Sequence, residues 1–286
     1  MISARDLPDV MEQWAPPAQV ASTGIASLDR LTAGMAPGRV WLVVGNPGEG
    51  RTTLLAQWAA AIARVPDQHV HLVAPREMPH AIAARLHSML GLVPLDHLTS
   101  GRDDESEQRT VRLERARERL EASSMSVYAR GDDAYVPEVH PWRAAAVPTA
   151  IVLDDADMVS GLTPLRVREY AEASMFVLLS LPRAAVFASP GGSVDLDPSW
   201  ARVADVVLEV EHRGVGTPSE PRPGEADLHV HYNRHGYVRT VAVQHQAHFS
   251  RFVEMGLPAR REPFSHERGS EVQGSPHALA QGPAGP

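Results

Sequence analysis

The chain contains neither cysteine nor lysine, and the two absences have different consequences. Without cysteine, disulfides and thiolate metal sites are excluded, and an intracellular protein is the simplest interpretation. Without lysine, all 27 basic residues are arginines. Any site that would ordinarily use an ammonium group must therefore use a guanidinium or lack that cation.

Long apolar runs are also missing from the 286 residues. No segment approaches the length of a membrane-spanning helix, and the N-terminus has no basic region followed by an apolar run. We therefore expect a cytoplasmic protein without membrane contact. The net charge of −8 argues against a broad basic face for nucleic acid, but it does not exclude a positive local patch or ring pore.

The most informative segment that is present is a glycine-rich loop after residue 44. The apolar run 40–44 predicts a buried strand, and the Ala- and Leu-rich run 52–64 predicts a helix. Between them, the spacing is that of a nucleotide phosphate loop, in which backbone N–H groups surround the phosphates and a hydroxyl ligates Mg²⁺. The helix N-terminus also favours an anion. The predicted nucleotide-binding residues are Gly45, Asn46, Pro47, Gly48, Glu49, Gly50, Arg51, Thr52 and Thr53.

Arg51 departs from this pattern, because phosphate loops carry a lysine at this position. A guanidinium is a wide planar fork and an ammonium is a compact point charge, so the two are not equivalent at a tight phosphate site. The arginine also agrees with a general loss of lysine from the chain, without any selected role. A tight turn between strand and helix is the alternative interpretation of the glycines. We expect nucleotide binding to be weak and turnover to be impaired.

The rest of the chain predicts a mostly parallel α/β sheet flanked by helices, with a C-terminal antiparallel hairpin that turns at residues 234–236. Residues 1–21 are expected to form a helix and linker, residues 22–254 one domain, and residues 255–286 a disordered tail. Further strands are expected at 69–74, 125–128, 149–154, 185–189, 205–211, 227–233 and 237–243. Helices are expected at 79–90, 107–121 and 163–182.

Acidic residues at strand ends supply the other groups that an ATPase needs, a metal carboxylate and a group that orients water. Asp154 ends an apolar strand and is the first candidate for the metal carboxylate. Asp155 is the alternative, although its side chain is expected on the other face of the strand. A strand-terminal turn would also explain both. Glu77 follows the second strand, at the sheet edge where ligands bind in open α/β folds.

Residues 22–254 resemble the RecA-like motor domain of the DnaB-type replicative hexameric DNA helicases, which are P-loop NTPases. The resemblance rests on the order of these segments: Thr23 to Arg39, Gly45 to Thr52, Pro75 to Met78, Leu153 to Met158, Ala204 to Leu208, and Tyr232 to Gly236.

This resemblance implies specific roles for residues of the chain. Thr52 and Asp154 would hold the metal, Glu77 would be the catalytic glutamate, and Arg51 would take the place of the catalytic lysine. Arg234 would be an arginine finger that acts on the neighbouring subunit's site. An ordinary exposed turn arginine is the alternative interpretation of Arg234.

Several positions depart from the family pattern. Besides Arg51, Asp157 stands where the family has a phosphate-sensing glutamine, Pro190 stands for a second glutamine after the serine matched by Ser189, and Tyr232 replaces a lysine. The loop 190–197 carries two acids and no base, so contact with a DNA strand would depend on other residues. The candidates for DNA contact are Arg166, Arg168 and Arg202.

The family's N-terminal primase-interacting domain is expected to be absent. Only the amphipathic segment 6–14 precedes the motor domain, and in a ring it would pack on the next subunit.

Histidines on the late strands are a weaker signal. His229 and His231 share a strand face, with His245 and His248 nearby, but zinc needs a closed set of three or four ligands. Exposed strand histidines are the simpler interpretation.

Two functions follow from these observations. The first is a divergent helicase motor that binds ATP and Mg²⁺, hydrolyses ATP weakly, forms a hexameric ring and acts on single-stranded DNA with replication proteins. The second is a catalytically impaired nucleotide-binding protein with a regulatory or structural role. Glu77, Asp154 and Arg234 favour the first; Arg51, the acidic loop and the net charge favour the second.

Overall fold

The computed structural model describes residues 20–100, 106–130, 149–173, 175–187, 197–212 and 224–255. These residues fall within one compact unit that extends to Met255. The predicted segment 6–14, Ser189 with Pro190, and the predicted tail from residue 256 lie outside the described residues.

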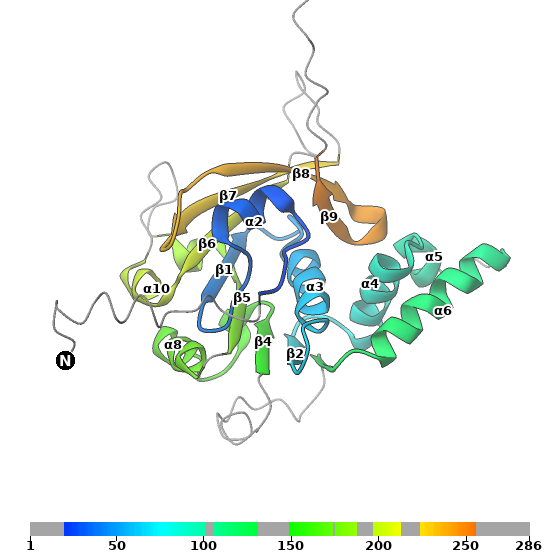
Figure 1. Cartoon of the computed structure of the whole chain (residues 1–286), viewed down its shortest axis with the longest axis horizontal. Helices are drawn as coiled ribbons and strands as arrows, with labels where there is room; N and C mark the ends of the chain where they lie inside the picture. Colours follow the sequence, from blue (N-terminus) through cyan, green and yellow to red (C-terminus); the bar gives the residue numbers. More distant parts are fainter. Residues whose placement is uncertain are drawn as a thin grey trace, which may run out of the picture. The chain divides into compact units, whose positions relative to one another are not determined.

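The centre of the fold is a sheet of nine described strands in the order β3-β2-β4-β5-β1-β6-β7-β8-β9 (Figure 1). The first six strands in this order pair in parallel, and the last three join them antiparallel. The predicted fold class is confirmed. The strands are β1 Val40–Gly45, β2 His69–Ala74, β3 Met125–Ala129, β4 Thr149–Leu153, β5 Phe176–Pro182, β6 Val206–His212, β7 Glu225–Asn233, β8 Thr240–Gln246 and β9 Arg251–Glu254.

Helices cover both faces of this sheet, so β1 is buried along its whole length. On one face, Trp41 packs edge-on against Trp58, with ring centroids 5.4 Å apart. On the other face, Leu42 and its neighbours pack against Tyr170. The helices are α2 Ala26–Thr32, α3 Arg51–Ile62, α4 Pro79–Gly91, α5 Leu95–Thr99, α6 Glu107–Glu121, α8 Pro164–Glu172, α9 Arg183–Val186 and α10 Pro198–Val203, with short 3-10 turns η1 Ala156–Met158 and η3 Ala247–Phe249.

The prediction of one helix over 163–182 is wrong in its second half. The helix α8 starts as expected, with the Thr163 side chain accepting a hydrogen bond from the Arg166 N–H, but it ends at Glu172. The segment from Phe176 to Pro182 is β5, between β1 and β4. A strand buried on both faces is continuously apolar and lacks the alternation that separates a strand from a helix. The strand predicted at 185–189 is also wrong, because α9 occupies Arg183–Val186.

Candidate nucleotide site

The predicted phosphate loop joins β1 to α3 at the carboxyl edge of the sheet. Gly48 and Gly50 have φ angles of 88° and 95°, in the left-handed region that glycine adopts without strain. A Cβ atom at Gly50 would lie 2.7 Å from the ring of Phe252 in β9, so this glycine is also required by packing. Asn46 and Pro47 are exposed, whereas Thr53 is buried at the start of α3.

Arg51 is buried, with 8% of its surface exposed, and forms an ion pair with Asp155. Its Nη2 lies 3.0 Å from Oδ1 of Asp155, and the Nε of Arg76 lies 3.7 Å from the other carboxylate oxygen. Burial, together with the charge of Asp154, raises the pKa of Asp155, and the two arginines oppose this shift. The buried Nη1 of Arg51 has no hydrogen-bond partner. The guanidinium is therefore held on one side and has an unsatisfied donor on the other.

The prediction that the Asp155 side chain lies on the other face of the strand from Asp154 is wrong, because both side chains reach the start of α3. Asp155 has a φ of 46°, in the left-handed region, so the alternation of strand side chains ends at this residue. Its backbone N–H donates to the Ser180 hydroxyl at 2.8 Å, and its side chain reaches Arg51. Both consecutive aspartates therefore contact the loop region.

Asp154 and Thr52 come together as the sequence predicts. The Thr52 Oγ1 donates to Oδ2 of Asp154 at 2.6 Å, and the Ser180 Oγ donates to Oδ1 at 2.5 Å. Asp154 is 2% exposed, so these hydroxyls hold a buried carboxylate in one orientation. The sequence analysis does not identify Ser180, because it predicts the run that forms β5 as part of a helix. A single hydroxyl within the run Leu178 to Leu181 is the signal that could identify it.

Glu77 lies at the same edge of the sheet, three residues beyond β2. The Asp154 N–H donates to the carbonyl oxygen of Val73 at 2.7 Å, which fixes the ends of β2 and β4 side by side. The Glu77 carboxylate is partly exposed and lies 3.7 Å from the guanidinium of Arg85. The phosphate loop, Asp154 and Glu77 thus share one edge, as in open α/β folds that bind ligands there.

Glu49 folds back into the phosphate loop. Its carboxylate accepts a hydrogen bond from the Asn46 backbone N–H at 2.5 Å and another from the Asn46 side-chain amide at 3.2 Å. The Glu49 N–H in turn donates to the Asn46 carbonyl oxygen at 3.3 Å.

Arg234, the predicted arginine finger, is bound within its own chain. Its Nε lies 3.0 Å from Oδ1 of Asp205, and its Nη2 donates to the carbonyl oxygens of Arg202 and Ala204 at 3.3 Å and 3.1 Å. Asp205 also accepts a hydrogen bond from Nη1 of Arg168 at 2.9 Å. Of the three candidates for DNA contact, Arg168 is therefore used in this ion pair, whereas Arg166 and Arg202 have exposed side chains.

Other departures from the family pattern are also placed by the structure. Asp157 is exposed in η1, next to the Asp154–Asp155 turn. Tyr232 is half-buried on β7 and packs against the hydrophobic cluster that contains Leu42 and Tyr170.

Three donors on β6 and β7 come close enough to hold a metal ion. One ligand atom each from Glu211, Asp227 and His229 lies within 4.8 Å of the others. His229 is already shared between the Thr240 hydroxyl at 2.8 Å and Glu211 at 2.9 Å, and Glu211 and Asp227 each have a further partner. These contacts are explained as a cross-strand polar network. His229 and His231 are half-buried in it rather than exposed, because the sheet face is partly covered.

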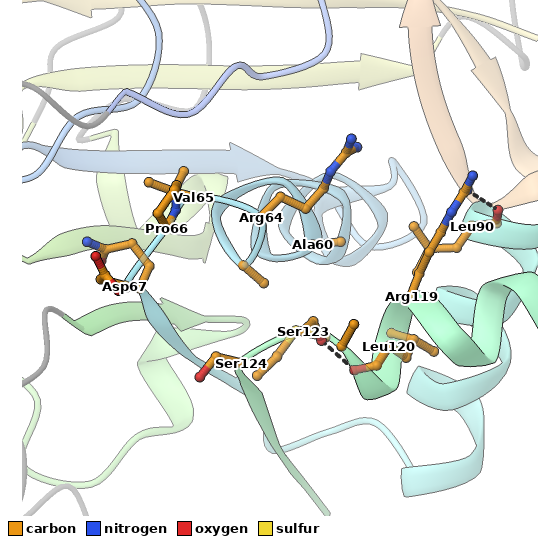
Figure 2. Close-up of a pocket in the computed structure, with 14 residues that line it drawn as sticks. Ala60, Arg64, Val65, Pro66, Asp67, Leu90, Arg119, Leu120, Ser123 and Ser124 are labelled. Carbon is orange, nitrogen blue, oxygen red and sulfur yellow. Dashed lines mark hydrogen bonds between the residues drawn. The ribbon is translucent and has the colours of Figure 1, made fainter.

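A cavity of about 730 Å³ lies away from this edge, at the opposite end of α3 (Figure 2). Arg64, Leu90, Arg119 and Leu120 are among the residues that line it. Nη1 of Arg119 donates to the Leu90 carbonyl oxygen at 3.0 Å. None of the described residues that line this cavity belongs to the phosphate loop.

Together, the parallel sheet, the glycine loop at the start of α3 and the acidic strand end define a RecA-like α/β fold with a phosphate-loop motif. Residues 21–137 match the family model of the DnaB-like helicase C terminal domain. The predicted resemblance to the DnaB-type helicase motor domain is confirmed.

The similar proteins agree with this relationship. The chain is 28% identical, over 259 residues, to the replicative DNA helicase DnaB of Leifsonia xyli subsp. xyli, a match that covers 82% of this chain and 55% of the relative. The chain thus spans about half the length of that relative.

Two solved structures share the fold. A DnaB-like replicative helicase, described together with its interactions with primase, matches with a TM-score of 0.72 and 15% identity over 90% of this chain and 67% of the other. A KaiC-like protein from Pyrococcus horikoshii matches with a TM-score of 0.54 and 15% identity, over 84% of this chain and 100% of the other. Among the described residues, no helix is long and apolar enough to cross a membrane.

Proposed function

We propose that this protein is a divergent DnaB-type motor that binds Mg·ATP, hydrolyses it slowly and acts on single-stranded DNA. The observation that carries the proposal is the convergence of three features at one sheet edge. These are the phosphate loop, the Thr52–Asp154 contact of 2.6 Å, and Glu77 beyond the neighbouring strand.

The residues of the site fit a magnesium nucleotide. The Thr52 hydroxyl and the Asp154 carboxylate offer the oxygen ligands that Mg²⁺ prefers. The unpartnered Nη1 of Arg51 and the amides at the start of α3 suit a phosphate group. A bound nucleotide would supply the phosphoanhydride bond that is broken.

The chain's own groups then have separate tasks. Asp154 holds Thr52 in place, Glu77 orients a water molecule, and Arg51 supplies positive charge. Arg51 is less free than a phosphate-loop lysine, because Asp155 holds its guanidinium at 3.0 Å and neutralises part of its charge. We therefore expect slow turnover rather than none.

A ring is part of this proposal. Arg234 can serve a neighbouring subunit only if it leaves Asp205, and replication proteins are candidate partners of such a ring. We also propose a cytoplasmic location, in keeping with a replicative role.

The alternative function is a nucleotide-binding regulatory or structural protein without translocation. Two observations favour it: Glu49 occupies part of the phosphate loop, and Arg168 and Arg234 are both engaged by Asp205.

Steady-state ATP hydrolysis with and without single-stranded DNA separates the two functions. The motor proposal predicts slow hydrolysis that DNA accelerates, that Glu77→Gln abolishes, and that Arg51→Lys increases severalfold. Nucleotide that raises the melting temperature without any turnover would support the alternative. Absence of both hydrolysis and binding would contradict both.

A further inference from the structure

The loop that should hold phosphate already contains an anion of the protein itself. The Glu49 carboxylate accepts two hydrogen bonds from Asn46, one of them from a backbone N–H of the loop. A carboxylate and a phosphate are both acceptors for charge-assisted hydrogen bonds from N–H groups. The two anions would therefore compete for this part of the protein.

The position of the carboxylate follows from its contacts with the ends of the loop. A Cβ atom built on Gly45 would lie 3.0 Å from Oε2 of Glu49 and 3.4 Å from Cγ of Arg51. The Glu49 carboxylate and the stem of Arg51 therefore both lie close to Gly45 at the end of β1, and Glu49 is only partly exposed. It points into the loop.

The charge around this position also disfavours a second anion. Glu49, Asp154 and Asp155 are acids at or beside the loop, whereas Arg51 and Arg76 both contact Asp155. A nucleotide would have to enter against these carboxylates, since the cations are partly neutralised.

We infer that Glu49 sets the nucleotide affinity of this site, because its carboxylate occupies the interior of the phosphate loop and must leave before a phosphate group can enter. The inference rests on the proposed nucleotide binding. It makes Glu49 a determinant of affinity in addition to Arg51.

A purely structural role for Glu49 is the competing explanation. The Glu49–Asn46 contact resembles a capping box, in which a Glu side chain bonds the N–H of the residue three positions earlier. In that case, removal of the charge would loosen the loop and weaken or leave unchanged the affinity for nucleotide.

Titration calorimetry with Mg·ATP and with Mg·ADP distinguishes the two roles. We expect Glu49→Gln and Glu49→Ala to bind at least about tenfold more tightly than the parent protein. Glu49→Gln retains the size of the side chain and an oxygen acceptor for Asn46, so the loop should remain folded. Glu118→Gln removes a charge from an exposed position on α6 and should bind like the parent.

Unchanged or weaker affinity in Glu49→Gln, with an unchanged melting temperature in the absence of nucleotide, would overturn the inference and leave nucleotide binding intact. If Glu49→Ala alone lost stability, the affinity of Glu49→Gln for nucleotide would decide between the two roles of Glu49. If the parent, both Glu49 variants and Arg51→Lys all failed to bind at millimolar nucleotide, the proposed function itself would be wrong. The two failures are thus distinguishable.

Discussion

Arg51, which is expected to contact phosphate, also belongs to a buried ion pair with Asp155. Loss of one member of such a pair leaves an uncompensated charge in the interior, which costs about 3 kcal/mol. We predict this cost for Asp155→Leu and for Arg51→Met, measured by urea denaturation. The double variant should be less destabilised than the sum of the two, because no buried charge is left unpaired and the other partner of Asp155, Arg76, is 60% exposed.

An exposed pair provides the control for this cycle. Arg117 and Glu121 are 2.8 Å apart on the solvent side of α6, and each side chain is 63% exposed. Arg117→Met should leave the denaturation midpoint unchanged, because such surface pairs contribute little. Strict additivity of Arg51→Met and Asp155→Leu would contradict the assigned ion pair.

His245 should make the protein sensitive to acid. Burial, with His212 and Arg85 nearby, lowers the pKa of His245 to about 4 from 6.5. Between these values the unfolded chain binds a proton that the folded chain does not, so stability falls as the pH decreases from 6.5 to about 4.

The measurement is the free energy of unfolding at a series of pH values in this window. His245→Gln should reduce the slope by less than about 1 kcal/mol per pH unit, after allowance for solvent screening. Some slope should remain, because burial also lowers the pKa of His71 to about 4. The same slope in His245→Gln and the parent would show that His245 is not the responsible group.

At the scale of elements, β9 closes over the start of α3. The Phe252 ring stacks on His245, with centroids 4.3 Å apart, and occupies the space next to Gly50. Gly48 has a similar φ but nothing lies within 4 Å of a Cβ atom built on it. Substitutions at these two glycines therefore distinguish the effect of backbone strain from the effect of packing.

We predict that Gly48→Ala destabilises the protein by about 1 kcal/mol, through backbone strain alone. Gly50→Ala should cost about 3 kcal/mol or more, because the Phe252 ring must also move. Urea denaturation of both variants gives the comparison. Phe252→Leu should lower the free energy of unfolding less in the Gly50→Ala background than in the parent protein. Equal destabilisation by the two glycine variants would exclude the packing explanation.

The contrast between predicted and observed elements has a physical basis. β2 and α6 match their predicted ranges, because a strand preceded by Gln68 and followed by Pro75 and a charged helix with a narrow apolar stripe each carry a distinct pattern. β5 does not, because a central strand is apolar on both faces. Four-residue β9 is too short to show a period.

The same reasoning applies to the candidate site. Thr52 and Asp154 could be paired from motif spacing, because a phosphate loop and a strand-terminal acid converge at one edge of a parallel sheet. Three further contacts could not be predicted. The ion pair of Asp155 depends on its left-handed backbone conformation, and the Ser180–Asp154 contact depends on β5, which the sequence predicts as a helix. The Glu49 contact depends on how the phosphate loop folds back on itself.

At the scale of the whole molecule, Asp205 contacts residues from three distant segments of the chain. Its buried carboxylate accepts hydrogen bonds from the Val40 N–H at the start of β1 and from Arg168 on α8, and it pairs with Arg234 beyond β7. Arg234 therefore has a structural role within the described subunit. An additional role in a neighbouring subunit would require that this guanidinium leaves Asp205 and takes a second position. Experiments on an assembled ring can test this role directly.

We predict complementation between two inactive variants, Glu77→Gln and Arg234→Ala, if Arg234 acts on the next subunit. Neither variant alone has a complete site, but a mixed ring places the intact Glu77 of one subunit beside the intact Arg234 of another. Random mixing at equal amounts would restore roughly a quarter of the sites. Steady-state ATP hydrolysis of the two variants, separately and mixed, is the measurement, with light scattering to confirm that both still assemble. If the mixture stays as inactive as its components while both form rings, Arg234 acts only within its own chain, through Asp205.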